Sequence, residues 1–174
     1  MIKIFQFLLE DVKTSDIETI SKIFIDCKKK FSFYLCNGGS ASIASHVSTD
    51  LNKVCNIKSR NFNEASHITC FSNDYGYDNW ITQTLKIYLK KSDIVILISS
   101  SGNSKNIVNA GKYCIKKKIK FITLTGFNKK NNLYSLSSSK GLNIWVNSKN
   151  YNFVENLHQI ILLLAVDKVN NSKF

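Results

Sequence analysis

The 174-residue sequence predicts a three-layer α/β/α sandwich built around a five-stranded parallel sheet. Two observations predict this fold class. Short apolar runs alternate along the chain with segments whose apolar residues recur every three or four positions, as in strands joined by crossover helices. In addition, residues 94–98 (IVILI) are apolar at every position, which is typical of a strand that helices cover on both faces.

Strands are predicted where short runs of β-branched, aromatic and other apolar residues stand between polar segments. These runs are residues 33–36, 68–71, 94–98, 119–124 and 142–146. Helices are predicted where apolar residues recur at helical spacing. These segments are residues 14–30, 41–53, 79–90, 106–117 and 153–169. The alternation of the two sets along the chain indicates parallel strands with helical crossovers.

The N-terminal segment, residues 1–30, is rich in apolar side chains near its start. Before Glu10 it contains Ile2, Ile4, Phe5, Phe7, Leu8 and Leu9. This is more apolar surface than one face of a peripheral helix buries in its own core, so a partner subunit is the simplest cover. Glu10 and Asp11 interrupt the run well short of the ~20 residues that span a bilayer. We therefore expect a single domain over residues 1–174, with residues 1–30 as a helical oligomerisation segment.

The composition is typical of a globular protein in a reducing compartment. The five cysteines are scattered without C-x-x-C spacing, and the start of the chain lacks the charged region and cleavage site of a signal peptide. The formal charge of +12 is spread over helices and loops, and every basic residue except Arg60 is a lysine. We expect a cytoplasmic protein that does not bind membranes and whose charge attracts small anionic substrates. A nucleic-acid-linked role is a third, weaker hypothesis that the charge leaves open.

The most informative stretch is residues 94–104, where the buried strand runs directly into SSSGNS. Hydroxyl groups and the free N–H groups of the following helix then lie beyond the carboxyl end of the strand, and both favour a phosphate. A serine-rich helix cap without a ligand would show the same pattern. Residues 37–40 (NGGS) repeat the arrangement after the first strand. If these two strands are neighbours where the strand order reverses, both loops face one pocket.

Several spaced motifs make the sequence similar to a known family. They are NGGSASIASH (37–46), NDYGYDNW (73–80), SSSGNSKNIVNA (99–110), TLTG (123–126) and VENLHQIILLL (154–164). On these motifs the chain resembles the sugar isomerase (SIS) domain family and, within it, the sedoheptulose-7-phosphate (phosphoheptose) isomerases. The resemblance covers nearly the whole chain and implies a flavodoxin-like SIS domain, a phosphorylated sugar as ligand, and a homotetramer with active sites between subunits.

The resemblance also implies which residues contact the substrate. They are Asn37, Gly38, Gly39, Ser40, Asn73, Asp74, Ser99, Ser100, Ser101 and Ser104. The four serines are expected to hold the phosphate, in agreement with the chemistry of the loop itself. Asn73 and Asp74 are expected to contact sugar hydroxyl groups.

The sequence departs from the family pattern at the positions to which the resemblance assigns proton transfer. The family's His and Glu, four apart after the NGGSA loop, are His46 and Asp50 here, and its C-terminal Gln and His are Glu155 and Leu163. Leu163 cannot transfer a proton, and Asp50 is one methylene shorter than Glu. We therefore name Asp50, Glu155 and His158 as candidate catalytic residues. For His158 the alternative is a packing histidine of an amphipathic helix.

Some members of the family bind a metal through those same positions. The resemblance therefore makes His46, Asp50 and Glu155 candidate ligands for Zn²⁺. His and Asp four residues apart are also common on solvated helix faces, and we expect that no cofactor is required. Neither loop contains the G-x-G-x-x-G dinucleotide pattern or a Walker lysine.

Two functional hypotheses follow. The first is a phosphosugar isomerase that interconverts the aldose and ketose forms of a heptose phosphate such as sedoheptulose 7-phosphate, in the synthesis of surface-polysaccharide precursors. The second is a non-catalytic SIS protein that binds a phosphosugar and acts as an adaptor or regulator. The serine loop is common to both. They differ in whether Asp50, Glu155 and His158 converge on the phosphate site.

Overall fold

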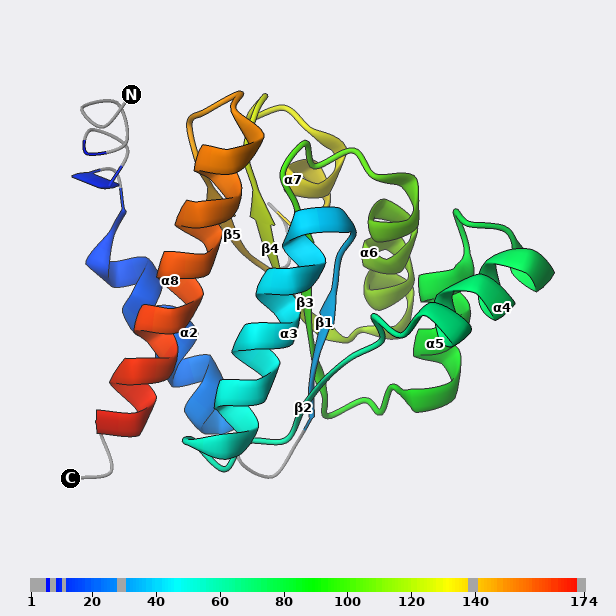
Figure 1. Cartoon of the computed structure of the whole chain (residues 1–174), viewed down its shortest axis with the longest axis horizontal. Helices are drawn as coiled ribbons and strands as arrows, with labels where there is room; N and C mark the ends of the chain where they lie inside the picture. Colours follow the sequence, from blue (N-terminus) through cyan, green and yellow to red (C-terminus); the bar gives the residue numbers. More distant parts are fainter. Residues whose placement is uncertain (1–5, 7–8, 11, 28–30, 138–140, 172–174) are drawn as a thin grey trace.

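The computed structural model describes residues 6, 9, 10, 12–27, 31–137 and 141–171. Within them, a parallel sheet has the strand order β2-β1-β3-β4-β5. Its strands are β1 (Ser32–Leu35), β2 (Ser59–Asn61), β3 (Ile94–Ser99), β4 (Lys120–Thr125) and β5 (Leu142–Trp145). The chain passes from β1 to one edge and then crosses back to β3, so the strand order reverses between β1 and β3 (Figure 1).

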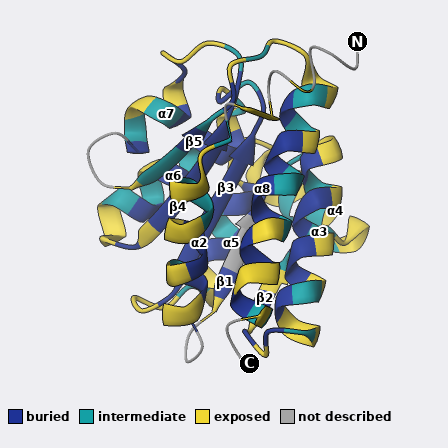
Figure 2. Cartoon of the chain, turned by 90° about the vertical axis from the view of Figure 1, so that its left-hand side faces the viewer, coloured by how far each residue is buried: buried dark blue, intermediate teal, exposed yellow. Residues whose placement is uncertain are grey.

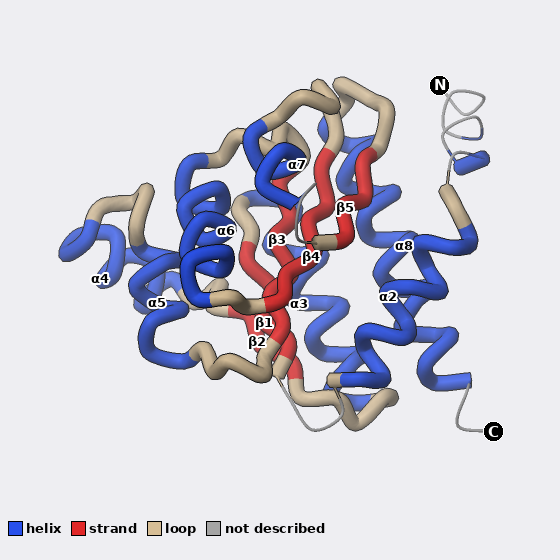
Figure 3. The backbone as a smooth tube through the Cα atoms, turned by 180° about the vertical axis from the view of Figure 1, so that it is seen from behind, coloured by secondary structure: helices blue, strands red, loops and turns tan. Residues whose placement is uncertain are grey.

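Helices cover both faces of this sheet, as the sequence predicts (Figure 3). On one face lie α2 (Thr14–Asp26), α3 (Gly38–Lys53) and α8 (Tyr151–Asn171). On the other lie α5 (Trp80–Tyr88), α6 (Lys105–Lys117) and the short α7 (Asn132–Ser137). The predicted helices therefore exist, with ends that shift by a few residues.

The alternation of side chains along β3 explains the two cores. Ile94, Ile96 and Ile98 pack with residues of α2, α3 and α8. Val95 and Leu97 pack with residues of α5 and α6 on the opposite face. Every residue of β3 is buried, which places the strand in the middle of the sandwich (Figure 2).

One predicted strand is wrong. Residues 68–71 lie inside the helix α4 (Ala65–Tyr75), and the edge strand of the sheet is instead β2. Ile68 and Phe71 are three residues apart, so they share one helical face and pack together against the second core. Four apolar or β-branched residues in a row had indicated a strand, but the contacts of these two side chains favour the helix.

The helix α4 is the most exposed part of the fold. None of its residues is buried, and it extends from the side of the sandwich beyond α5. Of the predicted oligomerisation segment, residues 1–30, most of the part before residue 12 lies outside the described residues. Leu9, which is described, is exposed.

The described helices contain no segment that is both long and apolar enough to cross a bilayer. The five cysteines are free thiols, and all except Cys70 are buried.

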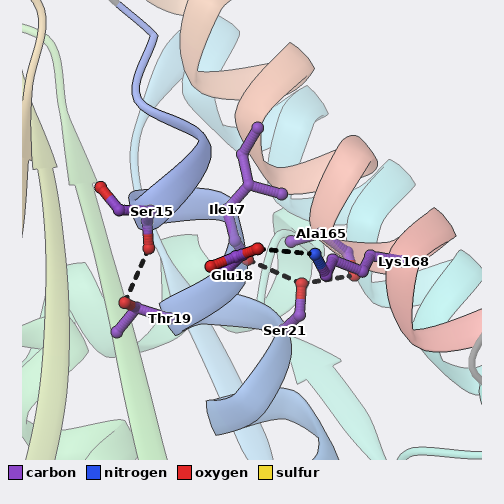
Figure 4. Close-up of polar contacts among 7 residues, drawn as sticks. All are labelled: Ser15, Ile17, Glu18, Thr19, Ser21, Ala165 and Lys168. Atoms are coloured by element: carbon purple, nitrogen blue, oxygen red, sulfur yellow. Dashed lines mark hydrogen bonds and ion pairs between the residues drawn. The ribbon is translucent and has the colours of Figure 1, made fainter.

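The outer helix α2 is fixed to α8 by packing and by two polar contacts (Figure 4). The hydroxyl of Ser21 donates to the carbonyl oxygens of Ile17 at 2.6 Å and Ala165 at 3.3 Å. Lys168 Nζ lies 3.1 Å from Glu18 Oε1, and both side chains are about half exposed. Because exposed ion pairs contribute little, the buried residues Ile20 and Phe24 supply most of the stability of this contact.

Candidate active site

A cavity of about 220 Å³ opens at the carboxyl ends of β1 and β3, where the strand order reverses. Its lining residues are Asn37, Gly38, Gly39, Ser40, Ile98, Ser99, Ser100, Ser101, Ser104, Tyr151 and Glu155. The two predicted loops therefore face one cavity. A larger hollow of about 420 Å³ between α6 and α7 contains neither loop, apart from Asn103 at its edge.

The serine loop, residues 99–104, surrounds one side of the cavity. Ser99 Oγ donates to Ser104 Oγ at 3.2 Å, and Ser101 Oγ accepts the N–H of Asn103 at 3.2 Å. Gly102 has φ = +67°, which favours glycine, and a Cβ there would collide with Asn131. The loop leads directly into α6, whose N-cap residue Ser104 makes no side-chain capping bond. The N–H of Ile107 donates to Asn106 Oδ1 at 2.9 Å, so the N–H groups of Lys105 and Asn106 are the ones at the start of α6 that remain available to an anion.

Ser100 is, with Ser99, one of two buried serines of this loop. The residue is 5% exposed, and its Oγ has no hydrogen-bond partner among the described residues. Its carbonyl oxygen accepts the N–H of Gly126 at 2.9 Å, which attaches the loop to the end of β4. A buried hydroxyl without a partner is costly, and a bound phosphate would supply the missing acceptor.

The second loop begins α3. Asn37 is the N-cap residue, but its side chain makes no capping bond. Gly38 has φ = +53°, a conformation that glycine adopts without strain. The Asn37 amide instead pairs with the amide of Asn106, and Tyr77 OH donates to Asn37 Oδ1 at 3.1 Å.

Glu155 is the only carboxylate among the residues that line the cavity. It projects from the first turns of α8, and Ser40 Oγ donates to its Oε1 at 3.4 Å. A Cβ at Gly39 would collide with this carboxylate, so the loop passes close to Glu155 only because residue 39 is glycine. Glu155 therefore lies against the 37–40 loop, inside the cavity that this loop shares with the serine loop.

His46 and Asp50 lie elsewhere on α3. His46 Nε2 is 3.3 Å from Asp50 Oδ2, and Gln159 Nε2 is 3.4 Å from His46 Nδ1. The side chains of His46 and Asp50 are 50% and 32% exposed, and neither lines the cavity of its own chain.

The predicted metal ligands do not come together within one chain. Across the described residues, no group of three His, Cys, Asp or Glu side chains has a geometry that could hold a metal ion. The three expected zinc ligands His46, Asp50 and Glu155 are therefore not grouped within the described residues of one chain. His46 and Asp50 point to the surface of α3, whereas Glu155 points into the cavity.

His158 does not face the cavity either. It is fully buried, and its Nε2 lies 3.2 Å from the carbonyl oxygen of Thr125. Burial lowers the pKa of His158 to about 4, so the imidazole is neutral near pH 7 and Nε2–H donates to Thr125. The structure therefore assigns His158 to the contact between α8 and β4 and corrects the expectation that it transfers protons to substrate.

Asn73 and Asp74 are near the end of α4 and are exposed. Asn73 Nδ2 donates to Asp74 Oδ1 at 3.0 Å, and neither residue lines the cavity of its own chain. Their contacts to sugar hydroxyl groups stay a prediction.

Three residues of this region were not predicted from the sequence: Tyr77, Asn106 and Tyr151. Tyr151 lies four residues before Glu155 on α8, and this spacing could have indicated that it shares the face of Glu155. For Tyr77 and Asn106 no sequence spacing signals the contact, because they meet Asn37 only after the sheet has formed.

Residues 3–126 match the family model of the SIS domain. A phosphoheptose isomerase of Buchnera aphidicola subsp. Acyrthosiphon pisum (strain Tuc7) is 38% identical over 136 residues, which cover 72% of this chain and 69% of that protein. A phosphoheptose isomerase of Aeromonas hydrophila is 32% identical over 127 residues, covering 69% of this chain and 66% of that protein.

Solved structures share the fold. A phosphoheptose isomerase from Francisella tularensis superposes with a TM-score of 0.85 at 21% identity, covering 96% of this chain and 91% of that one. A phosphoheptose isomerase from Neisseria gonorrhoeae superposes with a TM-score of 0.84 at 20% identity, covering 92% and 88%.

Proposed function

The chain belongs to the SIS domain family, and we propose that it is a phosphoheptose isomerase that interconverts the aldose and ketose forms of a heptose phosphate such as sedoheptulose 7-phosphate. The observation that carries this proposal is the convergence of the serine loop, the 37–40 loop and Glu155 on one cavity. The proposed role in the cell is the synthesis of surface-polysaccharide precursors in the cytoplasm.

In this proposal the phosphate group lies against Ser99, Ser100, Ser101 and Ser104. Three features support this position: the hydroxyl groups, the free N–H groups at the start of α6, and the unpartnered Oγ of Ser100. Residues 37–40 then contact the sugar, with Gly38 and Gly39 allowing the backbone to approach it closely.

Isomerisation transfers one proton between the C1 and C2 carbons and rearranges the protons of the two oxygens. We propose that Glu155 removes the carbon-bound proton and returns it to the neighbouring carbon through an enediol intermediate. Electrons and atoms balance within the substrate, so the reaction needs no oxidant, reductant or nucleotide cofactor. His158 keeps α8 attached to β4 and thus holds Glu155 in place.

We further propose that a homo-oligomer, a tetramer by analogy with the family, completes the site. His46, Asp50, Asn73 and Asp74 are on the surface of the described residues, although the resemblance assigns them to catalysis and sugar binding. In an oligomer, these residues of one subunit would contact the cavity of a neighbouring subunit. Residues 1–30 are proposed as part of this interface in a single domain over 1–174.

A panel of aldose and ketose phosphates, followed by proton NMR with the purified protein, tests the proposed activity. Conversion of a heptose phosphate, faster than that of shorter sugar phosphates, is expected. Binding of these compounds without conversion would instead favour the phosphosugar-binding or regulatory alternative.

A further inference from the structure

Three side chains form a hydrogen-bond network at the edge of the cavity. Asn37 Nδ2 donates to Asn106 Oδ1 at 2.9 Å, and Asn106 Nδ2 donates back to Asn37 Oδ1 at 2.9 Å. Tyr77 OH donates to the same Asn37 Oδ1 at 3.1 Å. Asn106 is only 2% exposed, whereas Asn37 lines the cavity.

A paired amide network of this kind can usually exist in two orientations, because the oxygen and nitrogen of both amides can exchange places. Here the backbone removes that choice. The N–H of Ile107 lies 2.9 Å from Asn106 Oδ1, and a backbone N–H can only donate. The oxygen of Asn106 must therefore be on that side, which directs its nitrogen, and hence the oxygen of Asn37, to the positions observed.

The hydrogen-bonding capacity of Asn37 can then be counted. Its oxygen accepts two bonds, from Asn106 and Tyr77, and this uses both lone pairs. One N–H donates to Asn106. Among the described residues, the second side-chain N–H of Asn37 has no hydrogen-bond partner. Because Asn37 lines the cavity, this N–H can donate to a ligand.

We propose that Asn106 and Tyr77 are positioning residues that make Asn37 a hydrogen-bond donor, and only a donor, toward a substrate oxygen. This inference rests on the proposed function and deepens it, because it specifies the recognition chemistry of the sugar-binding loop. The matching group of the ligand is an oxygen with a free lone pair, as in the carbonyl or a hydroxyl group of an open-chain sugar phosphate.

The substitution Asn106→Asp tests this proposal through pH. An ionised carboxylate at this position still accepts from Ile107 but has no hydrogen to give to Asn37 Oδ1. The two oxygens repel, Asn37 turns, and kcat/KM is expected to fall ~3- to 10-fold, as for the loss of one hydrogen bond. A protonated carboxyl group restores the donor, and burial raises its pKa above the ordinary range.

The variant's kcat/KM, divided by that of the wild type at each pH, is therefore expected to recover as the pH falls from 8 toward 5. Tyr77, Glu155 and the ion pair between Lys105 and Asp78, 3.7 Å apart, are the titratable groups that adjoin the network. All of them are present in both proteins, so the ratio cancels their own titration. A ratio that does not change with pH would overturn the proposal.

Asn52→Asp is the matched control, because Asn52 Oδ1 also accepts a backbone N–H, from Ser59 at 2.9 Å, and its Nδ2 also donates, to the Ser59 carbonyl oxygen at 3.0 Å, but Asn52 lies on α3 outside the network and does not line the cavity. Its ratio to the wild type is expected to be independent of pH. If this control and Asn106→Asp show the same pH profile, added charge explains the effect and the proposal fails.

Tyr77→Phe provides a second test in case Asn106→Asp does not fold, as judged by circular dichroism. Tyr77 is 54% exposed, so removal of its hydroxyl group is expected to leave the melting temperature unchanged while kcat/KM falls ~3-fold. Unchanged kcat/KM would contradict the role of Tyr77.

If the wild type binds sedoheptulose 7-phosphate without converting it, the proposed function fails. The same variants then decide the inference by calorimetric affinity, with the same expected dependence on pH. Affinity that is unaffected in both variants, or absence of any binding by the wild type, would overturn it.

Discussion

The two ends of the proposed site differ in how much of each a single chain supplies. Around the serine loop, hydroxyl groups, helix N–H groups and Glu155 all face one cavity of the same subunit. On the outer face of α3, by contrast, His46 and Asp50 pair with each other at the surface. In the proposed isomerase, the phosphate end of the site is thus built from one chain, whereas we propose that Asp50 acts in the cavity of a second subunit.

The largest expected effect comes from Glu155→Gln, which keeps the shape of the side chain but removes its basic oxygen. Turnover is expected to fall by on the order of 10² or more, while affinity for sedoheptulose 7-phosphate changes little. Glu18→Gln is the matched control, because Glu18 lies on α2 and pairs with Lys168 away from the cavity. Full activity of Glu155→Gln would reduce Glu155 to a substrate contact.

Mixed oligomers sharpen the comparison further. Asp50→Asn alone is expected to lower turnover ~10-fold or more. If Asp50 acts in the cavity of a neighbouring subunit, oligomers refolded from equal amounts of the Asp50→Asn and Glu155→Gln chains contain sites in which both carboxylates are intact. Activity is expected to recover to about a quarter of the wild-type value, as random assembly predicts. No recovery would mean that both residues act within one chain, whereas full activity of Asp50→Asn alone would mean that Asp50 is not involved.

The phosphate end is tested by the double substitution Ser101→Ala with Ser104→Ala. Loss of charge-assisted hydrogen bonds is expected to weaken sugar-phosphate binding by roughly 1 to 3 kcal/mol in calorimetry. Ser42→Ala, on the exposed side of α3, serves as control. Equal affinities of the two variants would remove the serine loop from the phosphate site.

The smallest effect concerns the stability of α8 against β4. The pKa of His158 is about 4 in the folded protein and near 6.5 when unfolded, so below pH 6.5 the unfolded chain binds a proton that the folded protein refuses. Lowering the pH from 7 to 5.5 is expected to cost roughly 1 kcal/mol of stability through this group. In His158→Gln, the side-chain amide still donates to Thr125, but the loss of stability that His158 causes between pH 7 and 5.5 should disappear. The melting temperature at each pH measures this, and a decrease as large as in the wild type would mean that other groups cause it.

The sequence predicts the local parts of this molecule well. The strand at 94–98 and the loop after it are continuous in sequence, so the apolar run and the SSSGNS motif suffice to place a polar loop at the carboxyl end of a buried strand. The helical segments are likewise visible because their apolar spacing reflects the face that they bury.

What the sequence does not predict depends on contacts between distant residues. The segment 68–71 has β-branched and aromatic residues, but its state is decided by the core that Ile68 and Phe71 meet. His158 has the chemistry of a catalytic residue, and only the position of Thr125 shows that it is buried against β4. Tyr77 and Asn106 reach Asn37 across sequence separations of 40 and 69 residues, which no local pattern indicates.

The central claim, that this protein catalyses isomerisation and does not merely bind a phosphosugar, is tested most directly in deuterium oxide. Proton NMR of sedoheptulose 7-phosphate with the wild-type protein should show an aldose product with deuterium incorporated at the carbon next to the carbonyl. With Glu155→Gln in place of the wild type, formation of the aldose product and incorporation of deuterium should both be slower by on the order of 10²-fold. Saturable binding of the sugar phosphate by the wild type, with neither product nor deuterium exchange, would contradict the account.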